Sequence, residues 1–136
     1  MATIKTFEEL DAWQVSRELY NKIGILIDDG CFRKNFRFIS QIEGSSGSIM
    51  DNIAEGFERG TRLEFIQFLG YSKGSCGEFR SQLYRAYDRK YITKDQFEEH
   101  CSLAIRISAM LQKFIAYLQK SEIQGARKKH NVPDIK

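Results

Sequence analysis

Four polar residues have the types and the spacing that acid–base chemistry or ligand binding would need. Asn52 and Glu55 lie three positions apart in one predicted helix, and Ser75 and Glu78 repeat this spacing in another. Residues three apart share a helix face, so two such pairs on facing helices would form one polar cluster. A catalytic or ligand site is one interpretation. The alternatives are simple exposure and a structural network that holds a nearby arginine, because buried carboxylates need partners.

The histidines, cysteines and glycines do not form a recognisable catalytic or metal motif. A di-iron bundle needs Glu-x-x-His on two helices, but the residue three before His100 is Phe and the one three before His130 is Arg. Cys101 adjoins His100 but falls on an apolar helical seam, which indicates a core thiol. The pair Gly70 and Gly74 lacks the Lys-Ser/Thr of a phosphate loop. We therefore expect no enzyme, no metal and no cofactor.

Basic side chains are the remaining candidates for binding. Residues 125–136 form a basic tail in which Arg127, Lys128 and Lys129 are consecutive and could contact phosphates. Four cations of the third predicted helix could extend such a nucleic-acid surface: Arg80, Arg85, Arg89 and Lys90. The alternative for the tail is a solvated terminus.

The composition is that of one globular domain. The 136 residues are 42% hydrophobic and 29% charged, and the single proline is Pro133, so the chain can be helical almost throughout. No run approaches the roughly 18 uninterrupted apolar residues of a membrane span, and no signal peptide is recognisable. Three separated cysteines without a CxxC motif indicate thiols in a reducing cytoplasm. We predict a cytoplasmic protein that does not bind membranes.

Charge is distributed unevenly along the chain. Residues 1–30 hold three basic and six acidic side chains, whereas residues 61–91 hold six basic and three acidic ones. The first helix is thus acidic and the third is basic. Either these two surfaces pair, within or between subunits, or the basic one faces nucleic acid.

Apolar periodicity predicts four helices, over about 7–28, 36–57, 61–90 and 93–124. Asn35 is a plausible N-cap, and Thr61 with Glu64 and Thr93 with Gln96 have the capping-box spacing. The connections at 58–61 and 90–93 are short, so neighbouring helices should be antiparallel. We therefore predict an all-α, up-down-up-down four-helix bundle over residues 1–124.

Glycines inside two predicted helices need an explanation, because each costs about 1 kcal/mol relative to Ala. They are Gly44 and Gly47 in the second helix, and Gly70, Gly74 and Gly77 in the third. Their spacing predicts a close contact between these two helices through small residues. A flexible or broken helix is the alternative.

The run from Gln41 to Gly56, which ends in Asn-Ile-Ala-Glu-Gly, resembles the signature of the four helix bundle protein family. That family includes proteins encoded by intervening sequences within bacterial large-subunit ribosomal RNA genes. The stretch from Phe7 to Trp13, with Glu64-Phe65, Gly74-Ser75, Glu78-Phe79 and Tyr91-Ile92, is also similar to the family, so the resemblance covers roughly residues 5–120.

The resemblance implies a bundle that assembles into a ring-shaped homopentamer. It also implies a likeness in fold to the accessory protein of diversity-generating retroelements, which works with a reverse transcriptase and nucleic acid. The chain departs from the family at Glu43, Gly44, Ser45 and Ser46, where the family commonly has basic residues and then alanines, and at Met50, where it has proline. These departures weaken the expectation of RNA binding more than that of the fold.

Together these observations favour a non-enzymatic homo-oligomeric interaction protein for RNA, other nucleic acid or an RNA-handling partner. A purely protein-binding adaptor or scaffold is the alternative, and an enzyme built on Glu55 and Glu78 is the third hypothesis.

Overall fold

The chain is helical across the part that the structure describes. The computed structural model describes residues 3–124, and the side chains of residues 3–121. A short 3-10 helix, η1 (Phe7–Glu9), precedes four α-helices: α1 (Asp11–Asp28), α2 (Phe36–Glu58), α3 (Arg62–Asp88) and α4 (Lys94–Gln124). Residues 3–124 contain no strand. The predicted all-α fold with four helices is confirmed.

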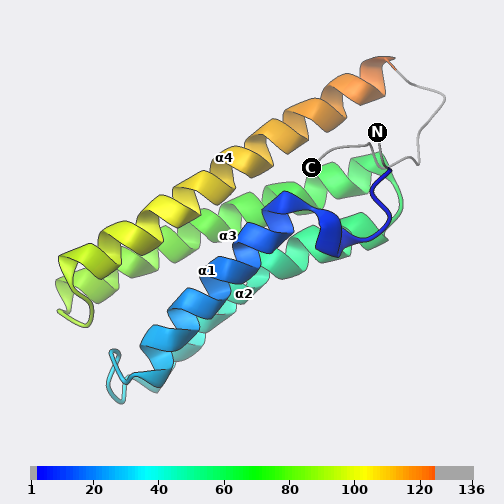
Figure 1. Ribbon diagram of the computed structural model, residues 1–136. Coiled ribbons are helices and arrows are strands. Elements are labelled where there is room, and N and C mark those ends of the chain that lie inside the picture. The colour runs from blue at the N-terminus through cyan, green and yellow to red at the C-terminus, as the bar shows by residue number, and fades with distance from the viewer. Residues whose placement is uncertain (1–2, 125–136) are drawn as a thin grey trace.

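Each helix packs on its neighbours in the chain, and α1 also packs on α4 (Figure 1). Within residues 3–124, no Cα atom of α1 lies within 8 Å of a Cα atom of α3, so these two helices are diagonal in the bundle. The α1–α2 and α3–α4 connections lie at one end, and the α2–α3 connection lies at the other (Figure 1). The outer faces of α1 and α3 therefore point away from each other.

The helices begin where the sequence supplies caps. Asn35 Oδ1 accepts a backbone N–H from the residue three positions later, at 3.2 Å. Thr61 Oγ1 accepts the N–H of Glu64 at 3.3 Å, and Thr93 exchanges two such bonds with Gln96. Each bond satisfies an amide that the first helical turn leaves unpaired. The predicted caps of α2, α3 and α4 are confirmed.

The first predicted helix is interrupted at Leu10, so its predicted start at Phe7 is wrong. Leu10 has an extended backbone (φ −75°, ψ 126°) and is only 1% exposed. The apolar side chain of Leu10 has no oxygen that could cap a helix. Its burial in the core requires the backbone to change direction before α1 begins. Gln14 spans the break, because its side-chain amide donates to the carbonyl of Glu8 at 2.8 Å.

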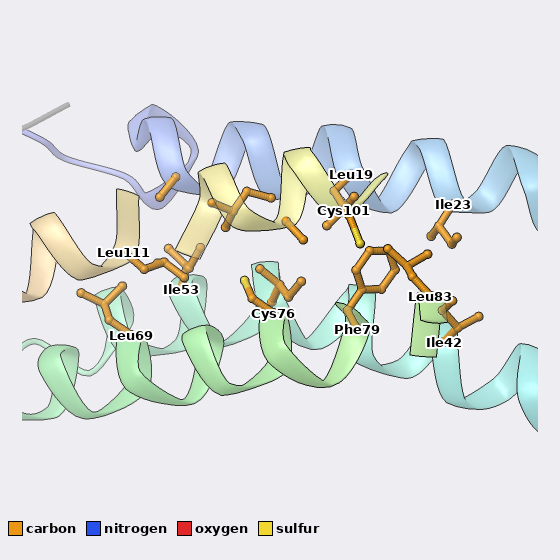
Figure 2. Packing of buried hydrophobic residues seen from close by; sticks show 14 of the residues in the cluster. Leu19, Ile23, Ile42, Ile53, Leu69, Cys76, Phe79, Leu83, Cys101 and Leu111 are labelled. Atoms are coloured by element: carbon orange, nitrogen blue, oxygen red, sulfur yellow. The ribbon is translucent and has the colours of Figure 1, made fainter. Parts of the chain in front are cut away.

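One hydrophobic core runs along the bundle and contains residues from all four helices. Figure 2 shows side chains such as Ile23, Ile53, Phe79 and Leu111 pointing into the space between the helices. Fully buried core residues include Leu19, Ile42, Ile49, Leu69, Cys76, Leu83, Ala104, Ile107 and Leu118. These positions follow the predicted helical seams, so periodicity located the core correctly.

Helix α2 comes very close to α3 at Gly56. A Cβ atom there would lie 2.6 Å from Phe68 Cβ and 3.1 Å from Phe65 Cδ1, which no ordinary packing tolerates. Further along the same interface, Ser72 Oγ donates to the carbonyl of Ile49 at 2.6 Å. The predicted contact through small residues therefore exists, but it uses Gly56 and buried serines.

The five glycines that were predicted to form this contact do not form it. A Cβ atom at Gly44, Gly70, Gly74 or Gly77 would meet no atom within 4 Å outside its own helical turn. Gly47 faces α1, where the ring of Tyr20 would lie 3.6 Å from such a Cβ. The prediction was wrong for these positions because spacing shows only that residues share a helix face. It does not show which face turns inward.

Helix α4 is long and apolar enough over Lys94–Ser121 to cross a membrane by length and composition alone. Core helices of soluble proteins meet the same criterion. One side of α4 contributes Ala104, Ile107, Leu111 and Leu118 to the core, whereas Lys113 and other charged residues are exposed. Packing within the bundle thus accounts for its apolar character.

Candidate interaction surfaces

The four residues of the predicted polar cluster do not meet. Asn52 Nδ2 donates within α2, to the carbonyl and hydroxyl oxygens of Ser48 at 2.8 and 3.1 Å. The carboxylate of Glu55 pairs with Arg59 at 2.8 Å, and Arg59 also reaches Glu64 at the start of α3. Glu55 is therefore tied to the end of the bundle where α2 connects to α3.

Glu78 lies elsewhere along the interface. It is 14 residues beyond Glu64 in α3, or about 21 Å along the helix axis. Glu78 instead borders a groove with Ser48 of α2, and Ser75 is half-buried nearby in the same helix. Because Arg59 bridges Glu55 to Glu64, Glu55 lies near Glu64 and far from Glu78, so the carboxylates of Glu55 and Glu78 cannot act on one substrate atom. The predicted single cluster of Asn52, Glu55, Ser75 and Glu78 is thus wrong, because equal face positions on two helices do not fix their offset along the axis.

The α2–α3 groove has a volume of about 600 Å³ and a polar lining. At its base the Ser45 hydroxyl donates to Gln82 Oε1 at 2.5 Å, and both side chains are buried. At its rim Arg85 donates to Gln41 Oε1 at 3.2 Å, and its guanidinium stacks on Phe38 at 5.2 Å from the ring centroid. Gln82 was not among the site residues predicted from the sequence. Gln82 lies beside the apolar residues of α3, on the side that faces α2. This position is the signal that could have identified it.

The outward face of α3 has three exposed glycines and is partly apolar. Gly70, Gly74 and Gly77 are exposed on it. Large apolar side chains flank this strip, and Leu63 and Tyr84 are 66% and 53% exposed. Exposed apolar surface beside bare backbone is typical of a contact surface.

The outward face of α1 carries a shallow depression of about 430 Å³ lined by residues of that helix alone. Arg17, Glu18 and Asn21 contribute polar groups, and Ile25 is 59% exposed beside them. On its other flank, Lys22 pairs with Glu99 of α4 at 3.1 Å. The acidic and basic helices therefore face opposite sides of one chain.

The predicted basic surface of α3 divides into two parts. Arg80 turns toward α4, where its Nε atom is buried, and it lies beside the thiol of Cys101. It therefore does not belong to an exposed surface. Arg85, Arg89 and Lys90 are exposed at the end of the helix. The three tail cations, Arg127, Lys128 and Lys129, lie outside the described residues.

The structure adds cations that the sequence analysis did not single out. Arg33, Lys34 and Arg37 belong to the α1–α2 connection and the first turn of α2, at the same end of the bundle as Arg89 and Lys90 (Figure 1). A signal was present, because residues 33–37 contain three cations in five positions.

Two thiols and one imidazole are buried in the core. Burial raises the pKa of the Cys76 thiol to about 12, so it stays neutral at physiological pH. Burial likewise raises the pKa of Cys101, which confirms the prediction of a core thiol. His100 is 3% exposed, and its Nδ1–H donates to the carbonyl of Gln96 at 2.7 Å. In the described part of the chain no three His, Cys, Asp or Glu residues are grouped to hold a metal ion.

Comparison with known proteins identifies a family. A family model described as 23S rRNA-intervening sequence protein matches residues 8–113. A crystal structure from Bacteroides thetaiotaomicron VPI-5482, described as a protein with unknown function from the S23 ribosomal protein family, is similar with a TM-score of 0.70 and 25% identity. The similarity covers 76% of this chain and 97% of that one. No curated protein matches.

Proposed function

Since the chain belongs to the 23S rRNA-intervening sequence protein family, we propose that it is a non-enzymatic, self-assembling helical protein that interacts with RNA or with an RNA-handling partner. The self-assembly rests on one observation, the exposed glycine strip of α3. Gly70, Gly74 and Gly77 each cost about 1 kcal/mol of helix stability, and within the described residues no close packing against another helix explains why a side chain is missing there. A contact with another copy would use the bare backbone and the flanking apolar side chains.

The placement of the helices supports the outer face of α1 as the surface that meets this strip. Helices α1 and α3 are diagonal in the bundle, and no Cα atom of one lies within 8 Å of a Cα atom of the other in the described chain, so the outer faces of both are open to a neighbouring copy. Because the two faces point in opposite directions, each copy would present α1 to one neighbour and α3 to the next. Such a head-to-tail contact generates a closed ring when the rotation closes.

We propose five copies, the number that the family resemblance implies, each with helices in up-down-up-down order. The alternation of the connections between the two ends of the bundle supports this order. A cytoplasmic location also belongs to the proposal, supported by three cysteines that form no disulfide. The interaction with RNA comes from the family description, which names an rRNA intervening sequence.

A protein-binding adaptor without nucleic acid is the second candidate. The α2–α3 groove favours it, because serine hydroxyls and the opposite charges of Glu78 and Arg85 suit a polar peptide. Failure of the assembled protein to retain RNA would favour this candidate.

Substitution of Gly74 by Leu tests the self-assembly. A Cβ atom at Gly74 has no neighbour within 4 Å in the described chain, so we expect the helical circular dichroism to persist while the assembly dissociates in sedimentation or light scattering. Gly44→Leu is the matched control, because Gly44 is equally open but lies on α2, and it should leave the assembly intact. A wild-type protein that sediments as a monomer would refute the proposal.

A further inference from the structure

The bundle carries a concentration of unpaired cations at the end where the α1–α2 and α3–α4 connections lie (Figure 1). We call this region the cationic end, and its six cations are Arg33, Lys34, Arg37, Arg85, Arg89 and Lys90. The ion pairs within the described residues involve none of these six. Over residues 28–37 and 85–95, seven cations, including Lys94, stand against four carboxylates, which leaves +3.

Aromatic rings hold several of these cations in place. The guanidinium groups of Arg33 and Arg89 lie 5.6 and 5.3 Å from the ring centroid of Tyr91. Tyr91 itself packs on Phe32, and its hydroxyl accepts a hydrogen bond from Asn35 at 3.1 Å. Cations from two separate connections are thereby fixed on one buried ring. This order reduces the entropy that a ligand would otherwise have to remove.

The backbone at the cationic end is strained at two cations. Arg33 and Lys90 have φ values of +56° and +61°, and they are the non-glycine residues with positive φ in the described chain. The ends of α1 and α3 allow a direct comparison. Gly30 and Lys90 close these helices with the same pair of backbone hydrogen bonds, but Gly30 adopts the left-handed conformation without strain. Strain of this kind tends to persist at functional positions.

We propose that the cationic end binds single-stranded nucleic acid. The six cations would contact phosphates, while bases would stack on the exposed guanidinium planes and on Phe36, which is 71% exposed. This assignment rests on the proposed interaction with RNA and adds the surface and the form of nucleic acid. An anionic membrane is the less suitable partner, because Phe36 is a single aromatic residue and not the apolar helix face that membrane binding needs.

Replacing the strained cations by glycine separates binding from folding. Lys90→Gly and Arg33→Gly remove charge and relieve backbone strain, so both variants should unfold at a temperature equal to or above that of the wild type. Binding of a fluorescent 20-nucleotide poly-uridine, measured by anisotropy at 50 and 200 mM salt, should weaken about three- to tenfold for each variant. The plot of log affinity against log salt should become shallower by about 0.7 for each cation lost.

Two further variants complete the experiment. Phe36→Ala should weaken RNA binding at every salt concentration without changing the salt slope, because stacking is not ionic. Lys113→Ala removes one exposed charge from the outer face of α4 and should change neither quantity. Anionic phospholipid vesicles and a duplex of the same length are the competitor ligands, and we expect both to bind more weakly than poly-uridine.

The outcomes distinguish this inference from the proposed function. Poly-uridine binding that is unchanged in Lys90→Gly and Arg33→Gly would uphold an RNA-binding protein but overturn the cationic end as its surface. Preference for vesicles or duplex would overturn single-stranded nucleic acid as the ligand. An assembled wild-type protein that binds no poly-uridine would overturn this inference together with the RNA interaction. It would leave the self-assembly standing.

Discussion

At the scale of single residues, burial was predictable and pairing was not. Periodicity placed Cys76 and Cys101 on core seams, and both are buried. The same reasoning grouped Glu55 with Glu78, which lie at different points along the α2–α3 interface. A period of 3.6 residues reports the direction of a side chain around its own helix, and the relative axial position of two helices depends on how their surfaces interlock.

Substitution of Gly56 tests most directly how the surfaces of α2 and α3 interlock. A Cβ there would lie 2.6 Å from Phe68 Cβ, an atom next to the backbone that cannot move freely. We expect Gly56→Ala to lower the free energy of unfolding by about 2–3 kcal/mol, since overpacking outweighs the gain in helix propensity. Urea denaturation measures the change.

Gly44→Ala is the matched control on the same helix. Its Cβ would meet no atom within 4 Å, so only helix propensity should act, and stability should rise by up to about 1 kcal/mol. Equal effects of the two substitutions would contradict the close approach at Gly56.

At the scale of elements, the helix starts that have a side-chain cap were predictable from the sequence. The break at Leu10 was not. Thr61 and Thr93 were recognisable because a capping box depends on residues only three positions apart. The break before α1 depends on tertiary burial of Leu10, which no local motif encodes. Local hydrogen bonding can be inferred from a short stretch of sequence, whereas the choice between continuing a helix and burying a side chain depends on the whole core.

The cap of α3 allows a quantitative prediction. Thr61→Ala removes the acceptor for the Glu64 amide and the partner of the Glu64 carboxylate, so we expect a loss of about 1 kcal/mol in unfolding free energy. Thr6 precedes η1 without a side-chain cap bond, and Thr6→Ala should have little effect. The comparison uses thermal unfolding of both variants, and a Thr61→Ala protein as stable as Thr6→Ala would count against the cap.

At the scale of the whole molecule, the sequence indicated that charge is segregated but not where each charge faces. The diagonal placement of α1 and α3 turns that segregation into two opposite surfaces. Arg85, Arg89 and Lys90 gain importance from neighbours in the α1–α2 connection, which is more than 45 residues earlier in the chain. Surfaces built from distant segments emerge only when the helices are assembled.

The two basic regions of the chain can be tested separately, because they join the bundle at opposite ends. Helix α4 has 31 residues, so Gln124 lies about 46 Å from the cationic end. A chain ending at Gln124 should therefore still bind poly-uridine through Arg33 and Lys90, with a salt slope reduced by at most about 0.7 for each tail cation that contacts phosphate. The full-length protein with glutamine at Arg127, Lys128 and Lys129 controls for length and should behave like the truncated chain. Complete loss of binding in both proteins would place recognition in the tail, since the cationic end alone would then be insufficient.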